Sequence, residues 1–106
     1  MKLPQKGFLL VTLYQYRNLW DFELINLAVA EYRLKGNYWI NHFSIALDEL
    51  ASAGLINRIG HRLDDGSAIE KDRLLFEFAL SDFGRQRMLD TGLLDFNSAT
   101  GESIND

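Results

Sequence analysis

Two histidines, His42 and His61, have the widest chemical range of any side chains in this sequence, because imidazole serves both as a metal ligand and as a general acid or base. The chain contains no cysteine, and its histidines do not follow the His-x-x-x-His spacing of a helical metal site. The neighbouring carboxylates of Asp64 and Asp65 could suggest acid–base catalysis. Because Gly66 follows them, they are more typical of a turn. We therefore expect no metal site here.

Two serines are candidate nucleophiles, Ser44 and Ser81. Neither has a histidine and an orienting acid at a recognisable spacing, and Ser81 is better interpreted as the N-cap of a helix. No glycine-rich phosphate-binding loop is present. The sequence therefore predicts neither an enzyme nor a bound cofactor, and it directs attention to binding.

The size and composition of the chain indicate which class of protein it belongs to. It has 106 residues, 47% of them hydrophobic and 25% charged, which is the mixture of a single globular domain. Its apolar runs are much shorter than the roughly 20 residues that span a bilayer, and no signal peptide is evident. We expect a cytoplasmic protein with no membrane contact. With 11 basic and 15 acidic residues, strong non-specific binding to a polyanion is not expected.

The acidic excess lies at the C-terminal end, where Asp95, Glu102 and Asp106 stand among small polar residues. Such a segment buries too little apolar surface to offset its ordering entropy. We expect one folded domain over residues 1–94 and a disordered acidic tail over residues 95–106.

Helical patterns occupy the first half of the domain. Residues 5–17 have a wide apolar face and predict a helix, although their Val, Thr and Tyr content leaves a strand as the alternative. A break follows, and Asp21 is the expected N-cap of a second helix that ends at Gly36-Asn37. A third helix is expected from about Tyr38 or Asn41 to Ala53. Its inward positions are Phe43, Leu47 and Leu50.

The period then changes to that of strands. Residues 55–63 predict one strand, and residues 64–67 a turn. Leu74, Phe76, Phe78 and Leu80 alternate with their neighbours, which predicts a second strand with these four side chains on the core. Ser81 begins a short last helix that ends at Thr91-Gly92. The expected fold is α+β, mostly α: a winged helix-turn-helix with three helices, a β-hairpin wing and a short C-terminal helix.

Two segments support this fold by resemblance. Residues 46–56 resemble the end of the recognition helix in MarR- and PadR-like regulators, with the pattern L-x-x-L-x-x-x-G-L-I. Residues 78–85 resemble the L-[ST]-x-x-G-[RK] signature of the same families, and the resemblance extends over roughly residues 22–89. It implies a transcriptional regulator that binds double-stranded DNA. Unlike in those families, we expect no long dimerisation helix after Gly92.

In such a regulator the exposed N-terminal half of the third helix reads base edges, and the wing holds the DNA backbone. The alternatives are an ordinary polar helix face, a solvated loop with internal charge pairs, or a winged-helix adaptor that binds protein and not DNA. The residues expected to contact DNA are Asn41, His42, Ser44 and Ile45 on the helix, Arg58, His61, Arg62, Lys71 and Arg73 on the wing, and Arg33 and Lys35 before the helix.

Aromatic residues are concentrated in the first half of the chain, in larger number than a domain this small can bury. Exposed aromatic side chains often mark interfaces. We therefore expect a homodimer, or contact with a partner protein, through the aromatic first helix. The candidate interface residues are Phe8, Tyr14, Tyr16 and Trp20.

Overall fold

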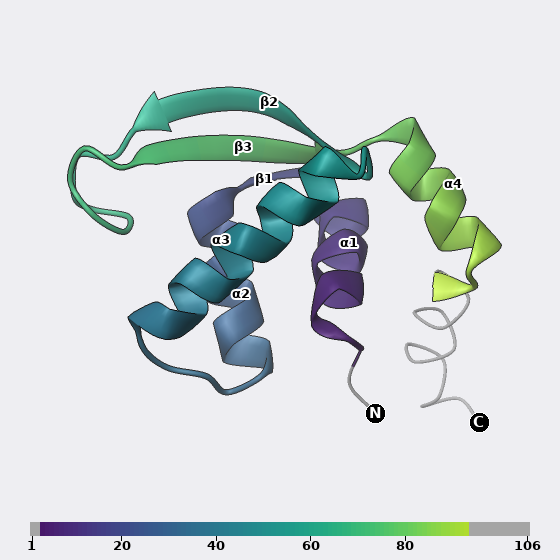
Figure 1. Ribbon diagram of the computed structural model, residues 1–106, viewed down its shortest axis with the longest axis horizontal. Coiled ribbons are helices and arrows are strands. Elements are labelled where there is room, and N and C mark those ends of the chain that lie inside the picture. Colours follow the sequence, from purple (N-terminus) through teal and green to yellow (C-terminus); the bar gives the residue numbers. More distant parts are fainter. Residues whose placement is uncertain (1–2, 94–106) are drawn as a thin grey trace.

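The structure of the protein is a computed structural model that describes residues 3–93. The predicted tail, residues 95–106, lies outside the described residues. Within the described residues, four helices and three strands make an α+β fold (Figure 1). In chain order they are α1 (Gln5–Tyr16), β1 (Asn18–Trp20), α2 (Asp21–Glu31), α3 (Asn37–Ser52), β2 (Ile56–Leu63), β3 (Leu74–Leu80) and α4 (Asp82–Asp90).

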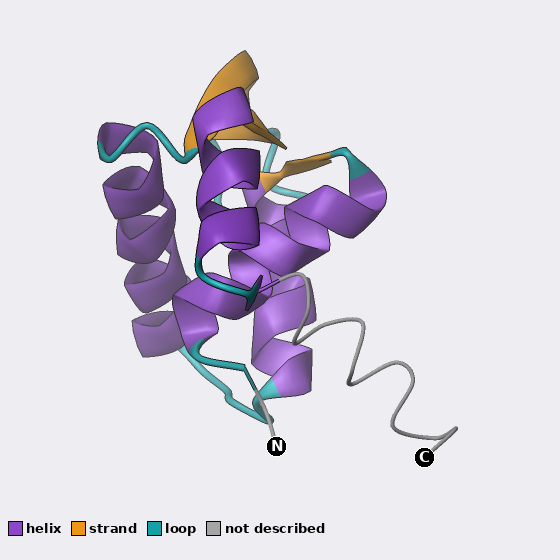
Figure 2. Ribbon diagram, turned by 90° about the vertical axis from the view of Figure 1, so that its right-hand side faces the viewer, coloured by secondary structure: helices purple, strands orange, loops and turns teal. Residues whose placement is uncertain are grey.

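The strands form one antiparallel sheet in the order β1-β3-β2. The predicted two-stranded hairpin is confirmed. The break expected after the first helix contains a third strand that was not predicted, β1, which pairs along the other edge of β3 with Leu19 opposite Phe78. A strand of three residues is too short to show alternation. The sheet covers one end of the helices (Figure 2), an arrangement that is consistent with a winged-helix layout without being diagnostic of it.

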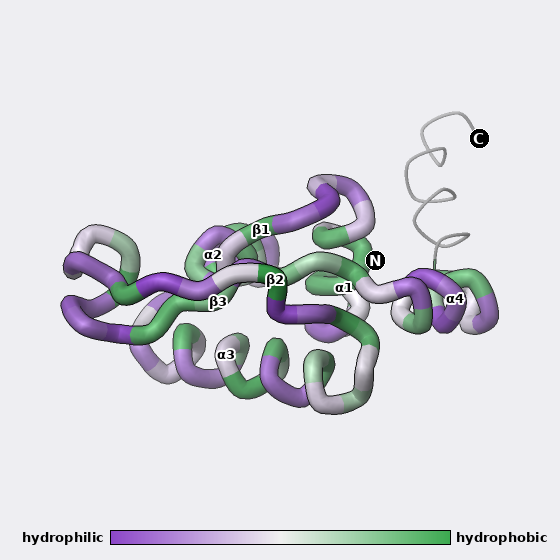
Figure 3. Tube along the Cα trace, turned by 90° about the horizontal axis from the view of Figure 1, so that it is seen from above, coloured by the Kyte–Doolittle hydropathy of each residue, from purple (hydrophilic) through white to green (hydrophobic). Residues whose placement is uncertain are grey.

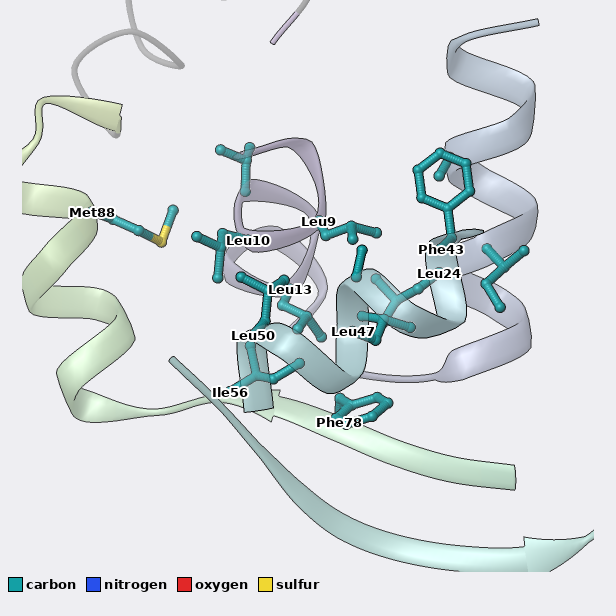
Figure 4. Close-up of a cluster of buried hydrophobic side chains, with 14 residues drawn as sticks. Leu9, Leu10, Leu13, Leu24, Phe43, Leu47, Leu50, Ile56, Phe78 and Met88 are labelled. Carbon is teal, nitrogen blue, oxygen red and sulfur yellow. The ribbon is translucent and has the colours of Figure 1, made fainter. Parts of the chain in front are cut away.

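The core lies between the sheet and helices α1 to α3 (Figure 4). Phe43 and Leu47 of α3 are 0% and 1% exposed, and Phe78 of β3 is 1% exposed, so the predicted inward positions are confirmed. Burial of each such side chain stabilises the fold by roughly 1.5–3 kcal/mol. Further core residues are Leu9, Leu13, Leu24, Ile25, Ala28, Leu50, Ile56 and Met88.

The alternation predicted for β3 holds at Phe78 but fails at its first residue. Leu74 is 47% exposed, and its neighbour Leu75 is completely buried. The loop of the hairpin extends beyond α2 and α3 at this end (Figure 3). Leu74 lines a hollow between β3 and α3 and is not packed into the core. Leu75 lies on the opposite side, in register with Arg62, whose guanidinium lies over the ring of Trp20.

Two helix ends differ from the prediction by a few residues. The second helix ends at Glu31 and not at Gly36, which instead precedes α3 with a φ of 102°. The N-cap of α2 is Trp20, because Asp21 is already helical. The predicted cap of α4 is confirmed, since the Ser81 hydroxyl accepts a hydrogen bond from the backbone N–H of Gly84 at 2.8 Å.

Candidate nucleic-acid interface

The outward side of α3 presents three uncharged residues in one line, Tyr38, Asn41 and Ile45, which we call the α3 stripe. The positions are three and four residues apart, so they lie on one face of the helix. Tyr38 is 68% exposed, Ile45 is 58% exposed, and Asn41 is also exposed. Within residues 3–93, the Asn41 amide has no hydrogen-bond partner. The stripe therefore combines one free amide with exposed apolar surface.

The two acids of α3 that follow the stripe, Asp48 and Glu49, are each paired with a cation from another element. The Lys6 Nζ lies 2.9 Å from the Glu49 Oε1, and the Arg58 Nη2 lies 2.7 Å from the Asp48 Oδ1. These pairs are exposed, so each contributes at most about 1 kcal/mol to stability. Their effect on the surface charge matters more than their contribution to stability. Each pair cancels a negative charge that would repel phosphates from this face.

Two predicted base-reading residues of α3 make contacts inside the protein instead. The His42 Nε2 lies 2.7 Å from the Gln5 Oε1 of α1. The Ser44 hydroxyl donates to the Ile40 carbonyl at 2.9 Å and accepts from the Arg73 guanidinium at 2.9 Å. Of the four helix residues predicted to contact DNA, only Asn41 and Ile45 belong to the α3 stripe.

The loop of the hairpin curls back toward the first half of α3 (Figure 1). A cleft lies between the loop and the helix. It has a volume of about 360 Å³. A smaller hollow of about 140 Å³ lies deeper between the helix and β3 and reaches Asp21 and Arg73. The larger cleft is lined by Asn37, Ile40 and Asn41 of the helix and by Ile69, Glu70 and Arg73 of the hairpin.

The hairpin loop, residues 64–72, is organised around the carboxylate of Asp64. Its Oδ1 accepts from the backbone N–H groups of Gly66 and Ala68 at 2.9 and 3.2 Å, and its Oδ2 accepts from those of Ile69 and Glu70 at 2.6 and 2.8 Å. Burial opposes the charge of Asp64, but these donors outweigh it and lower the pKa of Asp64 to about 2.

The sequence predicts a turn at Asp64 but not the hydrogen bonds that its carboxylate makes further along the loop. An aspartate followed two residues later by glycine indicates a local turn, and the bond to Gly66 is of that kind. The bonds to Ile69 and Glu70 depend on a loop path that no local pattern encodes. The loop is therefore built around one buried carboxylate, while most of its other residues are exposed to solvent.

A second buried carboxylate, Asp21, joins the sheet to α2. Its Oδ1 accepts from the Phe22 N–H at 2.7 Å, and its Oδ2 accepts from the Phe76 N–H at 3.2 Å. Desolvation raises the pKa of Asp21, while these hydrogen bonds and the charge of Arg73 oppose the increase. The residue predicted as a helix cap thus positions β3.

Three of the predicted wing cations contact other side chains of the hairpin or the helices. Arg58 lies over the Phe76 ring, 4.9 Å from its centroid, as well as pairing with α3. Arg62 lies over Trp20, and Arg73 donates to Ser44. Four other residues predicted to contact DNA are exposed and make no ion pair within residues 3–93. They are Arg33, Lys35, His61 and Lys71.

The four residues predicted to form a dimer interface differ in how much of their surface is exposed. Phe8 is half-buried against the Tyr32 ring, with the two centroids 5.7 Å apart. Trp20 is half-buried beneath Arg62. Tyr14 is 40% exposed with Arg85 over its ring, and Tyr16 is 57% exposed. Only Tyr14 and Tyr16 offer substantial exposed surface.

Comparison with known protein families and with curated proteins finds no match for this chain. Among the described residues, no cluster of three or more histidine and carboxylate side chains could hold a metal ion. No helix in the described part is long and apolar enough to cross a bilayer.

Proposed function

We propose that this protein is a sequence-specific, winged-helix DNA-binding regulator. The α3 stripe enters the major groove, and the hairpin loop lies against the adjacent backbone. The element order, with a helix followed by a two-stranded hairpin and a third strand pairing at the edge, is consistent with this use.

The observation that carries the proposal is the charge state of α3. A helix face with two free carboxylates would be repelled by DNA, whereas Asp48 and Glu49 are each neutralised by a cation from another element. The α3 stripe, which precedes them on the helix, is uncharged and exposed, so its amide and apolar groups are open to base edges. Arg33 and Lys35 precede the helix and Lys71 lies in the loop, so cations for phosphate contacts flank the stripe.

The number of flanking cations predicts how binding depends on salt. If Arg33, Lys35 and Lys71 each neutralise one phosphate, the plot of log affinity against log salt has a slope of about −3. The experiment is a fluorescence anisotropy titration of a random 20-base-pair duplex pool, and of duplexes selected from it, at several salt concentrations. Lys71→Ala should flatten the slope by about one, and Arg87→Ala, on α4, serves as the control.

Absence of binding to either DNA at low salt would contradict the proposal. A slope that Lys71→Ala and Arg87→Ala change equally would contradict the placement of the loop on the backbone.

A homodimer is part of the proposal, since two copies would read two half-sites. Tyr14 and Tyr16 are the exposed residues of the predicted interface. Light scattering should give twice the chain mass, and Tyr16→Ser should reduce it toward that of one chain. A monomeric mass for the unmodified protein, with and without DNA, would remove this part of the proposal.

A second candidate function, an adaptor that binds a protein, is favoured by the apolar side of the hairpin. Leu63 and Leu74 face each other across the strands and are 64% and 47% exposed. Such a pair is suited to a partner's apolar surface. Leu63→Ser with Leu74→Ser would abolish binding to a protein partner, whereas DNA affinity would change little, so the pair of measurements separates the two functions.

A further inference from the structure

The α3 stripe limits which base pairs this helix can read. Asn41 is its one hydrogen-bonding amide, and Ile45 is an exposed branched apolar side chain one turn further along. Of the other polar side chains in the N-terminal half, His42 and Ser44 are already hydrogen-bonded within the protein. Asn37 and Tyr38, at the first two positions of the helix, are exposed. No arginine or lysine lies within α3. The helix therefore lacks the side chains that most often read guanine.

Asn41 and Ile45 each match one feature of an A·T pair. An asparagine amide can donate to N7 and accept from the N6 amino group of adenine in a bidentate contact, a pattern that no other base presents in the major groove. A branched aliphatic side chain packs against the C5 methyl group of thymine. We infer that this protein prefers sites with A·T pairs at two neighbouring positions, with Asn41 reading the adenine and Ile45 a thymine methyl. This inference rests on the proposed function.

The spacing of the two side chains sets the spacing of the two pairs. Positions 41 and 45 lie about 6 Å apart along the helix axis. The rise between base pairs is about 3.4 Å, so the two contacts fall within about two base pairs of each other. The two acids further along the helix, Asp48 and Glu49, do not alter this pattern, because each is paired with a cation from another element.

The test begins with selection of duplexes from a random pool and continues with modified bases in the selected site. Replacing the contacted adenine by 7-deazaadenine removes the N7 acceptor and leaves Watson–Crick pairing intact. We expect it to weaken binding about five-fold or more. Replacing the contacted thymine by uracil removes one methyl group and should weaken binding about four-fold.

Two variants assign these losses to their residues. In Asn41→Ala the 7-deazaadenine substitution should cost nothing further, while the uracil substitution should still cost its full amount. In Ile45→Ala the pattern should reverse. Tyr38→Phe serves as the matched control from the same stripe, since it retains the ring and should respond to both modified bases as the unmodified protein does.

The outcomes separate the inference from the function on which it rests. If the pool yields no bound duplex, the proposed function is overturned and the inference with it. If duplexes bind but show no A·T preference, or if the unmodified protein is insensitive to both modified bases, only the inference is overturned. The measurements on the unmodified protein need no variant, so a variant that fails to fold does not block the test.

Discussion

The hairpin loop and the α3 stripe use their polar groups in opposite ways. In the loop, the Asp64 carboxylate accepts four backbone hydrogen bonds and is 2% exposed. In the stripe, Asn41 is exposed and has no partner within residues 3–93. The difference shows that a polar residue's neighbours, and not its type, decide whether it builds the fold or remains available to a ligand.

The largest expected effect follows from removing the carboxylate that organises the loop. Asp64→Ala leaves four N–H groups without their acceptor, so the loop should lose its order. We expect amide hydrogen exchange at Gly66, Ala68, Ile69 and Glu70 to approach the rate of an unstructured peptide, while the α3 amides keep their protection. Asp65→Ala is the control, since Asp65 bonds only to Ser67. Unchanged exchange at those four amides would show that the loop holds its shape without Asp64.

Acid should reproduce part of the same effect. The pKa of Asp64 is lowered in the fold from 3.8 to about 2, so its hydrogen bonds stabilise the protein fully above about pH 4. This contribution should disappear as the pH falls from about 4 through 2. The measurement is urea unfolding across that range for the unmodified protein and for Asp64→Ala. The difference between their free energies of unfolding should shrink with falling pH, and a constant difference would contradict the assignment.

A smaller effect should follow from the ion pair beside the stripe. Arg58→Ala leaves Asp48 uncompensated, and the reverse change, Asp48→Asn, removes that negative charge and releases Arg58. We expect the first to weaken DNA binding several-fold and the second to strengthen it, while Asp48→Asn changes the free energy of unfolding by about 1 kcal/mol or less. Glu23→Gln, on α2, is a distant control for the loss of one negative charge. Equal changes in affinity for Asp48→Asn and Glu23→Gln would indicate a general charge effect.

The smallest expected effect is the change in the free energy of unfolding when residues of the α3 stripe are replaced. Because Asn41 and Ile45 are exposed, their replacement by alanine should change the free energy of unfolding by only about 0.5 kcal/mol. Thermal and urea unfolding of both variants measure this directly. A loss of 2 kcal/mol or more at either position would mean that the stripe belongs to the architecture and is not a free surface.

Much of the fold could be predicted because its signals are local. The spacing of Phe43, Leu47 and Leu50 marks the buried side of α3, and Ser81 marks the start of α4. β1 was missed because its pairing with β3 joins distant parts of the chain, and three residues carry no period. The exposure of Leu74 depends on how closely α3 packs against β3, which alternation does not encode.

The candidate site was less predictable than the fold. Asn41 and Ile45 were correctly expected to face outward, because the helical period fixes the side of α3 on which they lie. The engagement of His42 by Gln5 and of Arg73 by Ser44 depends on contacts between separate elements. The neutralisation of Asp48 by Arg58 is likewise visible only in three dimensions.

The central claim, that α3 and the hairpin loop together form the DNA-contacting surface, is tested most directly by mapping backbone amide shifts on addition of a selected duplex. The account predicts the largest shifts at Tyr38, Asn41, Ile45 and Lys71, with little change in α4. Shifts centred on Tyr14, Tyr16 and α4, with none on α3, would contradict it.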